Sequence, residues 1–76
     1  MKTILIAGGC GFIGSNMCEY LITKNNYIIC LDNLSTGSIE NIKHLLKHPN
    51  FIFIEKDIID DINLNNIDHI DEIYNL

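Results

Sequence analysis

Closely spaced glycines follow an apolar run near the start of the chain, and they constrain its fold more than any other feature. The strand-like run of residues 3–7, apolar from Ile4 to Ala7, precedes these glycines, and a helical pattern follows them. Gly9, Gly11 and Gly14 satisfy the spacing G-x-G-x-x-G. Gly8, Gly11 and Gly14 satisfy the related spacing of one glycine at every third position. The stretch predicts a phosphate-binding loop, because a strand that turns tightly into a helix directs free backbone N–H groups and the positive end of the helix dipole toward an anion.

Each glycine has a physical role in such a loop. Either Gly8 or Gly9 makes the tight turn out of the first strand, since a residue without a Cβ tolerates unusual backbone angles. Gly11 lets the backbone approach a pyrophosphate, and Gly14 lets the helix pack closely on the sheet. A turn whose glycines serve packing alone is the alternative. The surrounding strand, helix and downstream acid favour phosphate binding.

The downstream acid is Asp32, which closes a second apolar run eighteen residues after Gly14. A carboxylate at this place accepts hydrogen bonds from the two hydroxyls of an adenosine ribose. A phosphate on the 2′ oxygen would meet that carboxylate at close range, and no Lys or Arg lies between Asp32 and Lys43. The sequence therefore predicts NAD, rather than NADP, as the cofactor.

Strands and helices alternate along the rest of the chain. The patterns predict strands at residues 2–7, 27–31, 51–54 and 70–76 and helices at 12–24 and from Ser38 to just before Pro49. We expect the first helix to bury Ile13, Met17 and Leu21, with Cys18 and Ile22 beside them, and the second to bury Ile39, Ile42, Leu45 and Leu46. Short connections between alternating elements predict parallel β-α-β units with right-handed crossovers and the strand order 3-2-1-4.

The expected fold class is α/β, with an incomplete sheet. Residues 28–31 and 51–54 are apolar on both strand faces, yet only two helices are predicted. A doubly wound sheet needs cover on both sides. We therefore expect residues 1–76 to form a partial NAD-binding Rossmann domain, the N-terminal part of a larger doubly wound sheet, without a substrate domain.

The composition excludes several other classes of protein. The formal net charge of −5 argues against a nucleic-acid surface, which needs clustered cations. No apolar run approaches the roughly 20 residues that cross a bilayer. The three cysteines have no C-x-x-C spacing, which argues against a disulfide framework or a zinc site. We expect a soluble cytoplasmic protein with no membrane or nucleic-acid partner.

Other chemistry-bearing residues have simpler explanations. A solvated helix face explains His44 and His48 better than a metal site does, and an exposed acidic loop explains the carboxylates near residue 57, so no metal is expected. Cys10 lies at a helix N-terminus, which lowers a thiol pKa, but a small residue filling the loop is the favoured interpretation. Tyr20 and Lys24 have a Tyr-x-x-x-Lys spacing on the first helix, where we expect no catalytic role.

Several groups of residues together carry a family resemblance. They are Gly8 to Ser15, Leu31-Asp32-Asn33 with Ser35-Thr36-Gly37, Asp57-Ile58, and Ile73-Tyr74-Asn75-Leu76. Over essentially the whole chain they resemble the N-terminal part of the extended short-chain dehydrogenases/reductases, which are NAD-dependent nucleotide-sugar epimerases, dehydratases and decarboxylases. Residues 32–37, 40–42, 48–51 and 71–76 are most similar to the UDP-glucuronate decarboxylase branch. A different dehydratase or epimerase branch, and a non-catalytic truncated dinucleotide-binding module, are the alternatives.

The resemblance implies the roles of individual residues. The backbone at Gly11, Phe12 and Ile13 would contact the pyrophosphate, with Gly8 and Gly14 in the same cofactor-binding loop, and Asp32 would hold the adenosine ribose. Further residues of the cofactor site would be Asn33, Ser35, Thr36, Gly37, Asp57, Ile58 and Leu76, with Phe12 and Ile13 in the pyrophosphate loop. The family's catalytic Tyr-x-x-x-Lys pair lies well beyond this part of the fold, so no catalytic residue is expected here. A nucleotide-sugar substrate and a homodimer are expected of a longer chain only.

Overall fold

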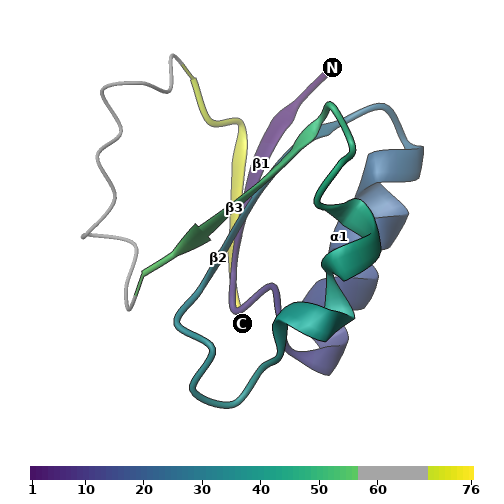
Figure 1. Cartoon of the computed structure of the whole chain (residues 1–76). Coiled ribbons are helices and arrows are strands. Elements are labelled where there is room, and N and C mark those ends of the chain that lie inside the picture. The colour runs from purple at the N-terminus through teal and green to yellow at the C-terminus, as the bar shows by residue number, and fades with distance from the viewer. Residues whose placement is uncertain (57–68) are drawn as a thin grey trace.

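The structure is a computed structural model that describes residues 1–56 and 69–76, and its centre is a parallel sheet (Figure 1). The order β3-β2-β1-β4 and the parallel pairing confirm the predicted α/β class and strand order. Both ends of each strand lie within about two residues of the predicted bounds. The strands are β1 (Thr3–Ala7), β2 (Tyr27–Asp32), β3 (Phe51–Glu55) and β4 (Glu72–Asn75).

The pairing register brings the carboxyl ends of the strands to the same edge of the sheet. Ala7 pairs with Leu31 on β2 and with Asn75 on β4. Asp32 pairs with Glu55 on β3. Residues that directly follow these strands therefore meet at one end of the molecule, although they lie far apart in the sequence.

Helix α1 (Phe12–Thr23) connects β1 to β2 and packs on one face of the sheet (Figure 1). Its buried residues are Gly14, Ser15 and Cys18, so its contact face is centred on small side chains. The prediction that Ile13 belongs to the buried face was wrong, because Ile13 is 67% exposed. The glycine at position 14 draws the first turn close to β1, which leaves its neighbour on the outer side. Met17, Leu21 and Ile22 pack partly against the core, as expected.

The predicted second helix is replaced by two short 3₁₀ segments, η1 (Ile39–Asn41) and η2 (Lys43–Leu45). The backbone leaves helical geometry at Ile42, where φ is −119° and ψ is 6°. Ile42 and Leu45 are buried as predicted, whereas Leu46 is 44% exposed. Ile39, Ile42 and Leu45 are spaced three residues apart, and 3₁₀ geometry places side chains at that spacing on one side, so short 3₁₀ turns suit the burial of Ile42 and Leu45. Ser38 caps η1, because its Oγ accepts a hydrogen bond of 3.2 Å from the Glu40 N–H.

The hydrophobic core lies on both faces of β1 and β2. Alternate residues of these strands point to opposite sides, as a pleated strand requires. Both central strands are flanked by neighbours, so their backbone polar groups are paired where side chains exclude water. The expectation of burial on both faces holds for β2 and not for β3, where Ile52 is 43% exposed. One face contains Ile4, Ile6, Cys10, Cys18, Ile28, Cys30, Ile42, Leu45 and Phe51, and the other contains Leu5, Ala7, Ile29 and Leu31.

The helical segments are all short. No helix in the described ranges, 1–56 and 69–76, is long and apolar enough to span a bilayer.

Candidate functional site

A cleft of about 810 Å³ lies at the carboxyl ends of the strands. Figure 1 shows that the turn after β1, the long loop after β2 and the C-terminus all lie at this end of the sheet. The volume is in the range of sites that hold small molecules and cofactors. The lining residues are Ala7, Gly8, Gly11, Phe12, Ile13, Gly14, Leu31, Asp32, Asn33, Ser35, Thr36, Lys56, Asn75 and Leu76.

Gly8 makes the tight turn out of β1, which settles the choice between Gly8 and Gly9. Its φ is +85°, a left-handed conformation that side chains disfavour. The Gly8 N–H donates to the Leu31 carbonyl at 2.7 Å, and the Gly8 carbonyl accepts from the Gly11 N–H at 3.2 Å. Gly9 has a different role, because a Cβ there would overlap the Cys30 sulfur. Gly9 therefore serves packing, while Gly8 shapes the turn.

Gly14 brings α1 into contact with the turn itself. A Cβ at Gly14 would overlap the Gly8 carbonyl oxygen and would lie 2.8 Å from the Gly9 Cα. The helix starts after Gly11, which provides no side-chain cap, and its first turn contains no acidic residue. The first N–H groups of a helix have no intrahelical acceptors, so those of Phe12, Ile13 and Gly14 are left to bind a ligand or water. This arrangement suits an anion placed on the helix axis.

Asp32 lies beside the glycine turn and is held by two backbone donors. One carboxylate oxygen accepts from the Cys10 N–H at 2.9 Å, and the other accepts from the Leu34 N–H at 2.7 Å. Only 9% of the residue is exposed, yet it lines the cleft. A carboxylate has about four acceptor positions, so two fixed bonds leave acceptor capacity for a ligand hydroxyl. The carboxylate is therefore oriented before any ligand arrives.

The loop after β2 is tied to the glycine turn through the carbonyl of Cys10. That oxygen accepts from the Ser38 N–H at 3.1 Å and from the Asn41 side-chain amide at 2.7 Å. Gly37 packs against the same peptide, since a Cβ there would lie 2.7 Å from the Cys10 carbonyl carbon. The loop is thus held against the glycine turn, with Asn33, Ser35 and Thr36 on the cleft side.

The three cysteines lie under the turn as free, buried thiols. Burial raises the pKa of the Cys10 thiol to about 11, and the nearby Asp32 carboxylate acts in the same direction. A hydrogen bond with Cys18 raises the pKa of Cys30, and burial adds to that effect. Neutral thiols are poor nucleophiles, so Cys10 and Cys30 act as small apolar groups that fill space, and Cys18 is fully buried among them.

The structure brings most of the predicted cofactor residues together. Gly37 is an exception, because it packs behind the cleft instead of lining it. Asp57 and Ile58 lie outside the described residues, as do two of the other loop carboxylates, Asp60 and Asp61. Leu76 lies against the turn, where its N–H donates to the Ala7 carbonyl at 2.9 Å. The residues that line the cleft as predicted are Gly8, Gly11, Phe12, Ile13, Gly14, Asp32, Asn33, Ser35, Thr36 and Leu76.

Sequence reasoning missed four lining residues, namely Ala7, Leu31, Lys56 and Asn75. Each is the last residue of a strand, the one before the last, or the one that follows it. Ligands of open α/β sheets bind outside the carboxyl ends of the strands, so a search of all four strand ends would have found them. Lys56 is the most consequential of them, because it is a cationic residue whose backbone N–H donates to the Asp32 carbonyl.

The remaining candidates lie apart from the cleft. The Lys24 ammonium is 5.3 Å from the centre of the Tyr20 ring, and neither residue lines the cleft. His44 faces Glu19, with 3.6 Å between the His44 Nε2 and the Glu19 Oε1. The His48 Nδ1 accepts from the Asn50 N–H at 3.0 Å. Each histidine thus has a separate partner, and no metal-binding group of three or more His, Cys, Asp or Glu occurs in residues 1–56 and 69–76.

Known proteins of one family match nearly the whole chain. A family model described as GDP-mannose 4,6 dehydratase matches residues 5–76. UDP-glucuronic acid decarboxylase 1 of Arabidopsis thaliana is 38% identical over 73 residues, which are 96% of this chain and 16% of that protein. The chain is also 35% identical over 75 residues to UDP-glucuronic acid decarboxylase 1 of Danio rerio, covering 99% of this chain and 17% of the relative.

Solved structures of related enzymes have the same arrangement of strands and helix. The dTDP-glucose 4,6-dehydratase of Bacillus anthracis in complex with NAD matches with a TM-score of 0.70 and 37% identity, covering 74% of this chain and 19% of that one. The present chain spans less than a fifth of the length of each of these three proteins.

Proposed function

Because the chain belongs to the GDP-mannose 4,6 dehydratase family, within the extended short-chain dehydrogenases/reductases, we propose that it binds NAD as the N-terminal part of a nucleotide-sugar lyase. The proposed reaction is the conversion of UDP-glucuronate to UDP-xylose and CO2, as the similarity to the decarboxylases suggests. The observation that carries the proposal is the pairing of an uncapped helix N-terminus with an oriented carboxylate in one cleft.

The phosphate end of the cleft fits a dinucleotide. The left-handed turn at Gly8 and the close contact at Gly14 leave room for backbone to approach a pyrophosphate. The free N–H groups of the first helical turn would donate to the phosphate oxygens. No carboxylate in that turn opposes the negative charge of the ligand.

The adenosine end of the cleft also fits. Asp32 would accept hydrogen bonds from the two ribose hydroxyls while it keeps its bonds to the Cys10 and Leu34 N–H groups. Such an acceptor favours NAD, because the 2′-phosphate of NADP removes one donor and adds negative charge beside the carboxylate. Asn33, Ser35 and Thr36 would complete this side of the site.

Bound NAD would supply a hydride acceptor for C4 of the sugar, so that the resulting 4-keto acid can lose CO2, and afterwards the hydride that restores C4. The role of the described residues is to hold and orient the dinucleotide. The sugar contacts and the Tyr-x-x-x-Lys pair belong, in this proposal, to chain beyond the 76 residues, and a homodimer is proposed for that longer form only. The proposed location is the cytoplasm.

A second candidate function is dinucleotide binding without catalysis. The observation that favours it is that the one Tyr-x-x-x-Lys spacing in the sequence, Tyr20 and Lys24, lies at α1 and outside the cleft. A chain of this kind would bind NAD and transform no sugar.

Titration of the ¹⁵N-labelled chain with NAD and NADP tests the proposal. We expect NAD to shift the amide signals of residues 11–14 and 32–36 and to bind more tightly than NADP. Asp32→Ala should weaken NAD binding more than NADP binding, because it removes the ribose acceptor and also relieves the repulsion of a 2′-phosphate. Glu40→Ala, which removes an exposed carboxylate from η1, is the matched control and should change neither affinity. Equal losses for both dinucleotides would refute the ribose role of Asp32.

A further inference from the structure

Lys56 lies in the cleft beside Asp32, although 24 positions separate them in the sequence. The parallel pairing of β2 and β3 places Asp32 opposite Glu55, and the next residue is Lys56. The Lys56 N–H donates to the Asp32 carbonyl at 3.2 Å, which fixes the lysine backbone next to the proposed ribose acceptor. The predicted preference for NAD rested on the absence of a Lys or Arg between Asp32 and Lys43 in the sequence. The fold brings a lysine from the end of another strand into the same cleft.

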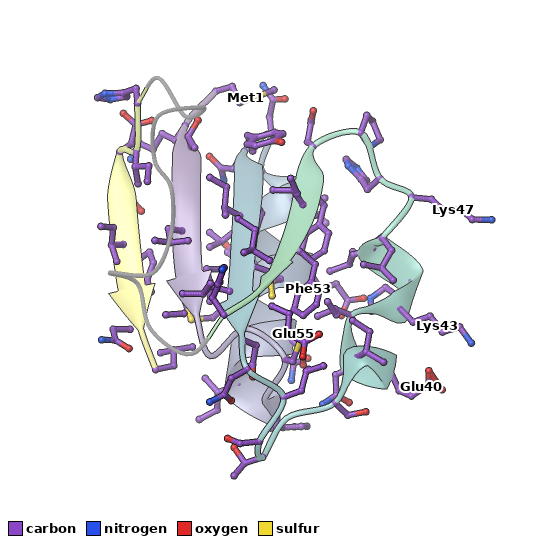
Figure 2. The ribbon with its side chains drawn as sticks, turned by 60° about the vertical axis from the view of Figure 1, so that its left-hand side comes forward. Met1, Glu40, Lys43, Lys47, Phe53 and Glu55 are labelled. Atoms are coloured by element: carbon purple, nitrogen blue, oxygen red, sulfur yellow. The ribbon has the colours of Figure 1, made fainter. Side chains whose placement is uncertain are left out.

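Among the residues that the structure describes, Lys56 is the only lysine or arginine that lines this cleft. The chain contains five Lys and Arg residues, and all five are lysines. Lys2 pairs with Glu72 on β4 at 2.7 Å, and Lys24 stacks over Tyr20. Figure 2 shows Lys43 on η2, and Lys47 on the chain that follows it, pointing away from the sheet. Of the five lysines, only Lys56 is therefore placed to act on an anion at the adenosine end of the cleft.

We propose that Lys56 determines how strongly this site discriminates between NAD and NADP. Its ammonium attracts the 2′-phosphate of NADP and so limits the preference for NAD that Asp32 imposes. Neighbouring strands are about 4.8 Å apart, so a side chain that follows β3 can reach a group bound at the end of β2. This role rests on the proposed function, because it requires the ribose to lie at Asp32.

The charges around the 2′ position oppose one another. Asp32 and the adjacent Glu55 contribute negative charge, while Lys56 contributes the positive charge. A phosphate monoester carries about −1.5 to −2 charges near neutral pH, so it responds to this balance much more strongly than a ribose hydroxyl does. NAD lacks that phosphate, and its affinity should be almost independent of Lys56.

The experiment measures the dissociation constants of NAD and NADP for the 76-residue chain and for Lys56→Gln, at low and at physiological salt. Lys56→Gln removes the charge and keeps a long polar side chain. We expect NADP to bind about fivefold more weakly, the size of one partly exposed ion pair, while NAD changes by less than about twofold. The NADP affinity of Lys56→Gln should also depend less on salt, because one phosphate contact is lost.

Two further variants make the result specific. Lys56→Arg keeps the charge and should retain NADP binding and its salt dependence. Lys47→Gln removes an exposed lysine that does not line the cleft and should change nothing. An equal loss of both dinucleotides in Lys56→Gln overturns the specificity role of Lys56 alone. If the unsubstituted chain binds neither dinucleotide, the proposed function fails, and the role of Lys56 fails with it.

Discussion

Replacing Gly14 by alanine tests whether α1 must touch the glycine turn. The added Cβ would overlap the Gly8 carbonyl oxygen and would lie 2.8 Å from the Gly9 Cα and 3.0 Å from the Gly8 carbonyl carbon. All three contacts are with backbone, so no side chain can rotate away to make room. Either the helix or the turn must move.

The free energy of unfolding should fall by about 1 to 2 kcal/mol. Over-packing a close contact costs about 1 to 3 kcal/mol, and the rigid backbone places Gly14→Ala in the upper part of that range. Alanine gains about 0.5 to 1 kcal/mol over glycine inside a helix, which offsets part of the cost. For a domain of this size each kcal/mol lowers the melting temperature by about 4 to 8 °C.

Gly11→Ala is the matched control, measured by thermal unfolding and by NAD titration. Gly11 has a φ of −74°, which alanine adopts readily, and a Cβ there would lie 3.5 Å from the Gly8 oxygen, an ordinary contact. Gly11→Ala should therefore keep its melting temperature. It should still weaken NAD binding, because the new methyl group would stand where the backbone approaches the pyrophosphate.

A Gly14→Ala chain that melts at or above the temperature of Gly11→Ala would refute this reasoning. That result would mean that α1 does not approach the turn as closely as the structure has it. A loss of NAD binding in Gly14→Ala without any loss of stability would also contradict it, since a displaced backbone should weaken binding and stability together.

Three smaller predictions concern the surroundings of the cleft. Iodoacetamide at pH 8 should label Cys10 far more slowly than a free thiol, because the Cys10 thiol is buried and its pKa is raised to about 11. Mass spectrometry follows the labelling, and labelling at the rate of a free thiol would contradict this. Asp71→Ala should lower the urea midpoint at pH 7. The hydrogen bond from the Thr3 N–H lowers the pKa of the Asp71 carboxyl most, and the hydrogen bond with the His69 side chain lowers it further. That stabilisation is present above the carboxyl's ordinary pKa and is lost as the pH falls through the lowered one, so the two midpoints should converge below about pH 4. Gly37→Ala should push the loop after β2 away from the Cys10 peptide, where the new Cβ would lie 2.7 Å from the carbonyl carbon, and should lower both the melting temperature and the NAD affinity; unchanged values would mean that the loop has room for a side chain.

The sequence by itself determined the local features of the site. Apolar runs, the glycine spacing and Asp32 predicted a strand, a tight glycine turn, a helix and an acid at the end of β2, and all four are present. Alternation of strands and helices was enough for the strand order, because short crossovers are right-handed and leave few arrangements. These features depend on neighbours in the chain, whose preferences can be read from spacing.

Only the tertiary structure decided the features that depend on register and close contact. Spacing alone left Gly8 and Gly9 as alternatives for the turn, and the contact with the Cys30 sulfur separates their roles. The exposure of Ile13 follows from the close packing at Gly14, and the 3₁₀ segments follow from the position at which Ile42 enters the core. Lys56 joins the cleft because β3 pairs with β2, a relation between distant residues that no local pattern records. All of these features depend on which residues come into contact in three dimensions, and for Lys56 a parallel sheet brings together strand ends that are separated by whole crossovers in the sequence.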